Sequence, residues 1–369
     1  MKKIIAISLI MILLCAPIFS QKKDRGTKDE TYKFKTIIEN PITPIKNQGL
    51  SGNCWCFSGL SFFESEILRV TGEEHDLSEM FIVSNAYYDR ALKYVRMHGH
   101  LKFCPGSSFS DVLTTLKTYG IVPENEMPYL NDSTEQYLYY ELDGVLKSIV
   151  SFLVESKLPK LSKVWKNGLK QMIATYLGET PQTFSLVQNE YTPNQYVSSL
   201  GIDLNDYVDI SSWDHHPFYQ KMILEVPDNW RGYEITYNVP INELIEIIDN
   251  AIENGYTIAW AGDISEDGFS DDGIAIVNND DNSTLVITQE IRQEAFDNYS
   301  TTDDHGMHIF GKATDQNGKE FYMVKNSWGD SGNYGGIWYI STEYILYKTT
   351  NIMLNKHAIP KNIQEKMGI

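Results

Sequence analysis

The sequence has little positive charge and no repeated units. Its 31 Lys and Arg residues stand against 49 Asp and Glu residues, which gives a formal net charge of −18 at pH 7. No internal repeat and no low-complexity tract stands out along the 369 residues. A surface this acidic repels phosphate groups, so the composition excludes a nucleic-acid partner that is bound by electrostatics.

A short hydrophobic leader opens the chain. Two lysines precede an apolar run over residues 4–14, and small or polar residues follow it. Such a run is too short for a transmembrane helix and is typical of a cleaved secretory signal. We therefore expect residues 1–20 to be a signal peptide, with no membrane span and a secreted or periplasmic product. Its two lysines leave with it, so the net charge moves from −18 to −20. A lipid anchor on Cys15 is less favoured, because Leu14 rather than a small residue precedes it.

One cysteine stands at the start of a helical pattern. Cys54 precedes an apolar stripe that runs to Ile67 and stops at Gly72, which predicts a helix. Without such a context, a cysteine is usually a small buried hydrophobe. A thiol at a helix N-terminus feels the positive end of the helix dipole, which favours the thiolate. A nearby imidazolium favours it further, and His-paired thiols have pKa values of roughly 3–4. We therefore expect Cys54 to be a nucleophile.

Three more residues complete the groups that a thiol peptidase needs. Gln48 lies six residues before the cysteine, His305 precedes a strand-like run over residues 306–312, and Asn326 follows a strand-like run over residues 321–325. His305 would hold the thiolate in an ion pair and later protonate the leaving amine. Asn326 would orient the imidazole. The Gln48 amide and the backbone N–H of Cys54 would donate to the oxyanion. The pattern predicts hydrolysis of a peptide or protein substrate through an acyl-thioester, without a cofactor or metal.

These motifs closely resemble the active-site segments of the papain superfamily. The resemblance implies an α+β fold of two lobes, a helical lobe and a β-rich lobe. It also places Gly106 on a substrate-binding backbone edge and Trp328 over the Asn–His hydrogen bond, at the substrate site. In papain, a cysteine three residues before the nucleophile forms a disulfide. This chain has Ser51 at that position. Half of that bridge is missing, so Cys104 is either free or paired with Cys56.

The spacing of the motifs indicates an insertion between the lobes. His305 lies 251 residues beyond Cys54, whereas about 130–150 residues separate these groups in papain-like enzymes. Apolar residues at helical spacing fall within 138–152, 161–177 and 241–252, which predicts a mostly helical insertion. His215 and His216 are interpreted as surface polar groups rather than metal ligands. We expect an N-terminal segment and helical lobe with the catalytic Cys over 21–130, a helical insertion over 131–256, and a β-rich lobe with the catalytic His, Asn and C-terminal tail over 257–369.

Four segments resemble the bleomycin hydrolase and aminopeptidase C branch of that superfamily, namely residues 260–263, 304–307, 323–329 and 355–360. The resemblance covers most of the chain after residue 36 and is weakest from about 180 to 240. It implies an aminopeptidase that forms a homo-oligomer and carries its C-terminal tail at the site. The carboxylate of Ile369 would then receive the α-ammonium group of the substrate. The alternatives are a secreted endopeptidase or oligopeptidase of papain type, a catalytically idle peptide-binding relative, and a thiol acyltransferase.

Overall fold

The computed structural model describes residues 32–130, 137–277 and 286–369. The predicted signal peptide over 1–20 and Cys15 lie outside the described residues. Within the described part of the chain, no helix is both long enough and apolar enough to cross a lipid bilayer.

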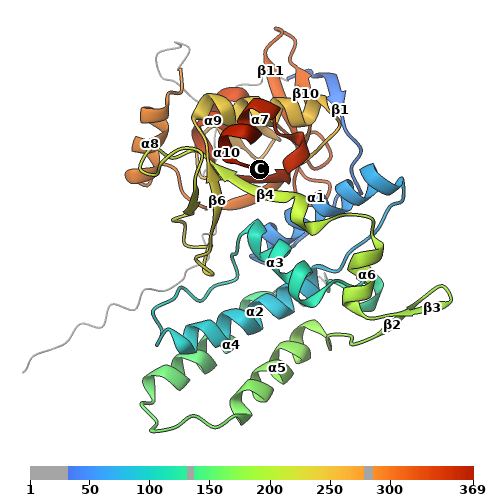
Figure 1. The fold of residues 1–369 in the computed structure, drawn as a ribbon, viewed down its shortest axis with the longest axis vertical. Coiled ribbons are helices and arrows are strands. Elements are labelled where there is room, and N and C mark those ends of the chain that lie inside the picture. Colours follow the sequence, from blue (N-terminus) through green and yellow to red (C-terminus); the bar gives the residue numbers. More distant parts are fainter. Residues whose placement is uncertain (1–31, 131–136, 278–285) are drawn as a thin grey trace, which may run out of the picture. The chain divides into compact units, whose positions relative to one another are not determined.

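Five long helices form the helical part of the protein. They are α1 (Cys54–Thr71), α2 (Glu79–Arg96), α3 (Phe109–Tyr119), α4 (Leu138–Glu155) and α5 (Val164–Leu177). The α2 helix contacts α3, α4 and α5, and Figure 1 shows α2, α4 and α5 running side by side. The α1 helix ends as the sequence predicts, because Gly72 adopts a left-handed conformation with a φ of 75°.

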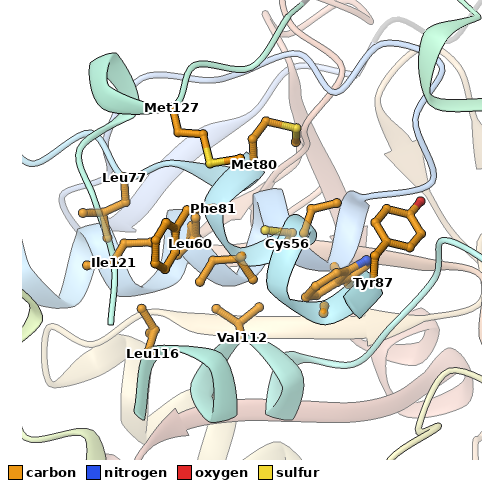
Figure 2. Close-up of a cluster of buried hydrophobic side chains, with 14 of the residues drawn as sticks. Cys56, Leu60, Leu77, Met80, Phe81, Tyr87, Val112, Leu116, Ile121 and Met127 are labelled. Atoms are coloured by element: carbon orange, nitrogen blue, oxygen red, sulfur yellow. The ribbon is translucent and has the colours of Figure 1, made fainter. Parts of the chain in front are cut away.

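The core of this helical part is built on the buried face of α1. Leu60 is fully buried and packs in one cluster with Met80 and Phe81 of α2. Cys56 lies in the same cluster, as Figure 2 shows, and its thiol donates a hydrogen bond to the carbonyl oxygen of Glu79 at 3.5 Å. Burial of this face fixes the rotation of α1, because residues 54 and 56 of a helix point in different directions.

A mixed sheet of eleven strands forms the second part. Its order is β5-β6-β4-β13-β7-β10-β11-β12-β9-β8, and β1 pairs with β10. The strands are β1 (Lys35–Glu39), β4 (Tyr207–Ser211), β5 (Lys221–Ile223), β6 (Glu234–Asn238), β7 (Ile258–Gly262), β8 (Phe269–Ser270), β9 (Ile274–Ala275), β10 (His305–Thr314), β11 (Glu320–Lys325), β12 (Ile337–Ser341) and β13 (Thr349–Asn355).

Shorter elements complete the fold. The strands β2 (Phe184–Leu186) and β3 (Asn189–Tyr191) form a separate hairpin. The remaining helices are α6 (Pro193–Ser199), α7 (Ile241–Glu253), α8 (Gln289–Asp297), α9 (Thr342–Lys348) and α10 (Lys361–Met367), with three 3-10 turns at Glu124–Glu126, Leu204–Asp206 and Lys356–Ala358. Helices α7 and α10 contribute buried side chains to the same apolar core as the central strands, and Figure 1 shows both helices lying over the sheet.

The structure confirms the predicted α+β class and corrects the description of the insertion. Helices α4, α5 and α7 lie where the apolar stripes predict them. However, the segment between α6 and α7 supplies β4, β5 and β6 to the main sheet, so the insertion is not helical throughout. Strand β4 pairs with β13, with Ile210 opposite Ile352. Because Tyr32–Ile369 forms one compact unit, the boundaries predicted at residues 130 and 256 do not separate independent bodies.

Candidate active site

Cys54 is the first residue of α1 and lies beside the first residues of β10. The earliest hydrogen bonds of the helix run from the amides of Cys56 and Phe57 to the carbonyl oxygen of Asn53, at 2.9 and 3.1 Å. The amide of Cys54 therefore precedes the hydrogen-bond ladder of α1, where it can donate to a substrate oxygen. The Ser58 hydroxyl lies 2.5 Å from the carbonyl oxygens of both Cys54 and Gly306 and so fixes β10 against the start of the helix.

His305 begins β10, and Asn326 directly follows the neighbouring strand β11. The imidazole Nε2 is 2.8 Å from Asn326 Oδ1. That same oxygen accepts the backbone N–H of Ser327 at 2.8 Å, which sets the orientation of the amide. Nε2 must therefore carry the hydrogen and donate it, which leaves the Nδ1 lone pair to accept a proton.

Trp328 covers this pair. Its ring centroid lies 4.8 Å from that of His305, with a 32° angle between the two planes. Phe269 and Trp338 pack edge-on against the indole from the other side. The position agrees with a role in shielding the hydrogen bond between His305 and Asn326 from water.

Two hydrogen bonds fix the orientation of the Gln48 side-chain amide. Its Oε1 accepts a hydrogen bond from the Ser327 hydroxyl at 2.5 Å, and its Nε2 donates to the carbonyl oxygen of Ser51 at 2.8 Å. One N–H of the side-chain amide then remains for a substrate oxygen. Ser327 thus joins the Gln48 segment to the strand that ends at Asn326, since its carbonyl also accepts the Gln48 N–H at 2.8 Å.

Burial of Cys54 acts against the thiolate that the helix terminus favours. Burial raises the pKa of Cys54 to about 12, although the backbone amides of Gly306 and Trp55 act in the opposite direction. Burial also lowers the pKa of His305 to about 4, although the hydrogen bond to Asn326 opposes the shift. Burial is therefore the largest influence on the pKa of both groups, and it opposes the formation of an ion pair.

Gly106 lies in the loop before α3 and is enclosed by other groups. Arg90 donates hydrogen bonds to its carbonyl oxygen and to that of Cys104. A Cβ atom on Gly106 would lie 2.1 Å from Oδ2 of Asp228. A carboxylate from the insertion therefore lies against the residue that is predicted to form the substrate-binding edge.

The structure places Ile369 away from these residues. Its backbone N–H bonds to the carbonyl oxygen of Gln364, and its side chain packs against the apolar core beneath α7 and α10. Lys366 of α10 pairs with Glu243 of α7 at 2.6 Å. The expectation that the Ile369 carboxylate enters the active site is therefore wrong for this structure, because the tail forms a helix that packs on α7.

The thiols of Cys54 and Cys56 are not in disulfides, so the alternative of a Cys56–Cys104 bridge is wrong. Where papain has its half-cystine, the Ser51 hydroxyl donates to the carbonyl oxygen of Gln48 at 2.8 Å. Cys104 lies against Arg90, with Nη2 3.4 Å from its sulfur. The two segments that a disulfide joins in papain are linked here by the Trp55 indole N–H, which donates to the carbonyl oxygen of Pro105 at 3.0 Å.

The two adjacent histidines lie close to an acidic residue, but their hydrogen bonds do not suit a metal. The ligand atoms of His215, His216 and Glu225 lie within 4.8 Å of one another. The Gln293 amide nitrogen donates to Nδ1 of His215 at 2.9 Å, and its Oε1 accepts from a backbone amide, which fixes its orientation. Nε2 of His215 therefore carries a hydrogen and donates to Glu225 at 3.0 Å. His215 and Glu225 therefore form a hydrogen-bonded pair at the surface.

The sequence alone did not identify Asp228 and Asp303, two acidic residues that act on Cys54. Asp228 and Asp303 both add to the rise in the pKa of Cys54. Asp303 lies two residues before His305 in the sequence, and this spacing indicates that the Asp303 carboxylate lies near the active site. Asp228 lies in the stretch where the resemblance is weakest, and nothing in its local sequence points to the nucleophile.

The comparisons with known proteins agree with this geometry. The profile of the Peptidase C1-like family matches residues 16–368. The chain is 22% identical to aminopeptidase G from Lactobacillus delbrueckii subsp. lactis over 89% of this chain and 85% of that protein. It is 23% identical to aminopeptidase W of the same organism, over 94% of this chain and 86% of that protein. It is 20% identical to the mitochondrial cysteine proteinase 1 of Saccharomyces cerevisiae, over 93% of this chain and 81% of that protein. The crystal structure of PepW from Lactobacillus rhamnosis HN001 shares the fold, with a TM-score of 0.69 and 20% identity, over 95% of this chain and 86% of that one.

Proposed function

Because the chain belongs to the Peptidase C1-like family, we propose that it is a cysteine aminopeptidase that hydrolyses peptide bonds through an acyl-thioester. The observation that carries the chemistry is the 2.8 Å hydrogen bond from His305 to Asn326, beside a thiol at the start of α1. The names of the aminopeptidase relatives support removal of N-terminal residues.

Each group has one role in the proposed reaction. Nδ1 of His305 takes the proton of the Cys54 thiol as the sulfur attacks the scissile carbonyl carbon. The amide of Cys54 and the Gln48 side chain donate to the oxyanion. The imidazolium then gives its proton to the leaving amine, and the acyl-thioester remains. Finally, His305 takes a proton from water, the hydroxide attacks the thioester, and the proton returns to the thiol.

The location and assembly of the protein are part of the proposal. The leader over 1–20 supports a secreted or periplasmic enzyme, and N-terminal sequencing of the exported chain tests cleavage near residue 20. The resemblance to the bleomycin hydrolase branch supports a homo-oligomer that acts on peptides. Light scattering on the chain after chromatography tests that assembly.

The decisive experiment compares three substrate classes with residues 21–369 of the chain. Fluorogenic aminoacyl amides with a free N-terminus should be cleaved, their acetylated forms should be poor substrates, and blocked peptides with internal bonds should resist. Cys54→Ala is the control that should remove all turnover. Faster cleavage of internal bonds than of N-terminal residues would overturn the aminopeptidase assignment in favour of an endopeptidase.

A further inference from the structure

A loop of the insertion lies across the substrate-binding edge. Residues 224–233 connect β5 and β6 of the sheet, and we call them the bridging loop. The Trp230 indole N–H donates to the Ser107 hydroxyl at 2.7 Å, and Arg231 pairs with Asp89 of α2 at 3.1 Å and with Asp111 of α3. The loop therefore starts in the sheet and is anchored on the helical part of the protein.

The tip of this loop places a carboxylate where a substrate chain would pass. A Cβ atom on Gly106 would be 2.1 Å from Oδ2 of Asp228, which is far closer than real Cβ contacts allow. Only glycine leaves space for this approach. A peptide that pairs with Gly106 therefore meets the carboxylate instead of an open groove, so only a short N-terminal piece of substrate fits.

A second carboxylate, that of Asp303, lies near Asp228 and the nucleophile. The backbone N–H of Asp228 stabilises the charged form of Asp303, which joins the bridging loop to the segment before His305. Oδ2 of Asp303 is buried and has no hydrogen-bond partner within the described residues. A buried acceptor without a donor is unfavourable unless a ligand supplies one.

We propose that Asp228 and Asp303 form the receptor for the α-ammonium group of the substrate, and that the bridging loop closes the groove behind it. This rests on the proposed function and names the part of the protein that gives it exopeptidase selectivity. It assigns to a loop of the insertion the role that the sequence suggested for the C-terminal carboxylate.

Carboxyl groups outnumber the cations around the pair, even with Arg231 paired to Asp111. Lys102 lies 3.8 Å from Asp228, and Arg90 also acts on it. Against these stand Asp111 and Asp304, and burial together with the mutual repulsion raises the pKa values of both Asp228 and Asp303. An ammonium group can donate three charge-assisted hydrogen bonds and adds a positive charge beside these carboxyl groups.

The same cation would activate the nucleophile. Both carboxylates raise the pKa of the Cys54 thiol. A bound ammonium cancels their effect, so the thiol would lose its proton to His305 more easily when a free N-terminus is in place. Substrate recognition and formation of the nucleophile are thereby coupled.

The test uses Asp228→Asn and Asp303→Asn, with Glu225→Gln as the matched control. Glu225 is an exposed acid of the same loop and pairs with His215. Each Asn variant should lose about 10- to 100-fold of the preference for free over acetylated N-termini in kcat/KM, the value of a charge-assisted contact. The control should keep the wild-type preference. An unchanged preference in both Asn variants would overturn the proposal.

A second measurement does not depend on turnover. Iodoacetamide modifies the Cys54 thiolate, and its rate against pH reports the pKa of the thiol. In the Asn variants the profile should move to lower pH, and leucinamide should accelerate modification of the wild type while acetyl-leucinamide should not. If the wild type proves not to be an aminopeptidase yet shows this leucinamide effect, the proposed function fails and the ammonium site stands. Acceleration that persists in the double Asn variant would place the receptor elsewhere.

Discussion

At the scale of single residues, the chemistry depends on which nitrogen of His305 carries the hydrogen. Asn326 Oδ1 is an acceptor because it already receives the Ser327 N–H, so it fixes the hydrogen on Nε2. The Nδ1 lone pair is then left for the thiol proton. Burial of the site makes the separation of charge between the thiol and the imidazole unfavourable.

The first prediction separates the two cysteines of α1. Cys54→Ala should abolish turnover and labelling by thiol alkylators at the site, whereas Cys56→Ala should keep most of the activity. Cys56 points into the core, so its loss should lower the melting temperature rather than kcat/KM. Peptidase assays and thermal unfolding of both variants provide the measurement. Turnover by Cys54→Ala would refute the assignment of the nucleophile.

The second prediction concerns the supporting pair. His305→Ala should reduce kcat/KM by nearly as much as Cys54→Ala, roughly 10⁴-fold or more, because the two residues act as a unit. Asn326→Ala should cost less, about 10²-fold, because it orients the ring and carries no proton. The hydrogen bond to Asn326 raises the pKa of His305, so its loss should also move the acid limb of the pH profile to lower pH. A larger loss in Asn326→Ala than in His305→Ala would reverse the two roles.

At the scale of elements, the C-terminal helix tests which part of the chain controls selectivity. Ile363 and Met367 of α10 are buried against the core shared with α7. Deletion of residues 361–369 should therefore lower the free energy of unfolding by about 3–6 kcal/mol, from about 1.5–3 kcal/mol for each buried side chain. The preference for free over acetylated N-termini should not change, and both quantities are measured on the same preparation.

A second variant keeps this experiment informative if the truncated chain does not fold. Three residues appended after Ile369 would move the terminal carboxylate without removing α10. We expect unchanged stability and unchanged selectivity. A gain of activity on acetylated substrates would return the role of ammonium receptor to the C-terminus.

The sequence predicts the helices, but it does not predict which distant strands pair with one another. The pattern from Cys54 to Gly72 fixes the limits of α1, and the apolar stripes locate α4, α5 and α7. By contrast, β4 and β6 pair in parallel and reach the sheet through β13, more than a hundred residues away in sequence. Short apolar runs do not reveal such partners. The catalytic groups were predictable because they sit in local motifs, whereas Asp228 reaches the site only through this long-range pairing.

At the scale of the whole molecule, buried charges hold the helical part against the sheet. Lys46 pairs with Glu64 of α1 at 3.1 Å and with Glu79 of α2 at 2.8 Å. Lys325, at the end of β11, donates to the carbonyl oxygen of Thr43 at 2.8 Å. These contacts fix the segment before Gln48 between α1 and the strand that carries Asn326. The geometry of the active site therefore depends on the ionisation of groups outside it.

The last prediction follows from buried acids in a chain with a net charge of −18. Burial raises the pKa of Asp209 to about 7 and that of Asp143 to about 7, well above their values in the unfolded chain. The folded state therefore binds protons that the unfolded state has lost, so stability falls as pH rises through the folded pKa. His305 works in the opposite direction, but only below its unfolded pKa of about 6.5.

Between pH 6.5 and 8 the two acids should lower the free energy of unfolding by about 1–2 kcal/mol. Urea unfolding across this range measures the slope, and Asp209→Asn should make the slope shallower, because the amide does not titrate. A free energy of unfolding that rises between pH 6.5 and 8 would show that these carboxylates are charged in the folded protein.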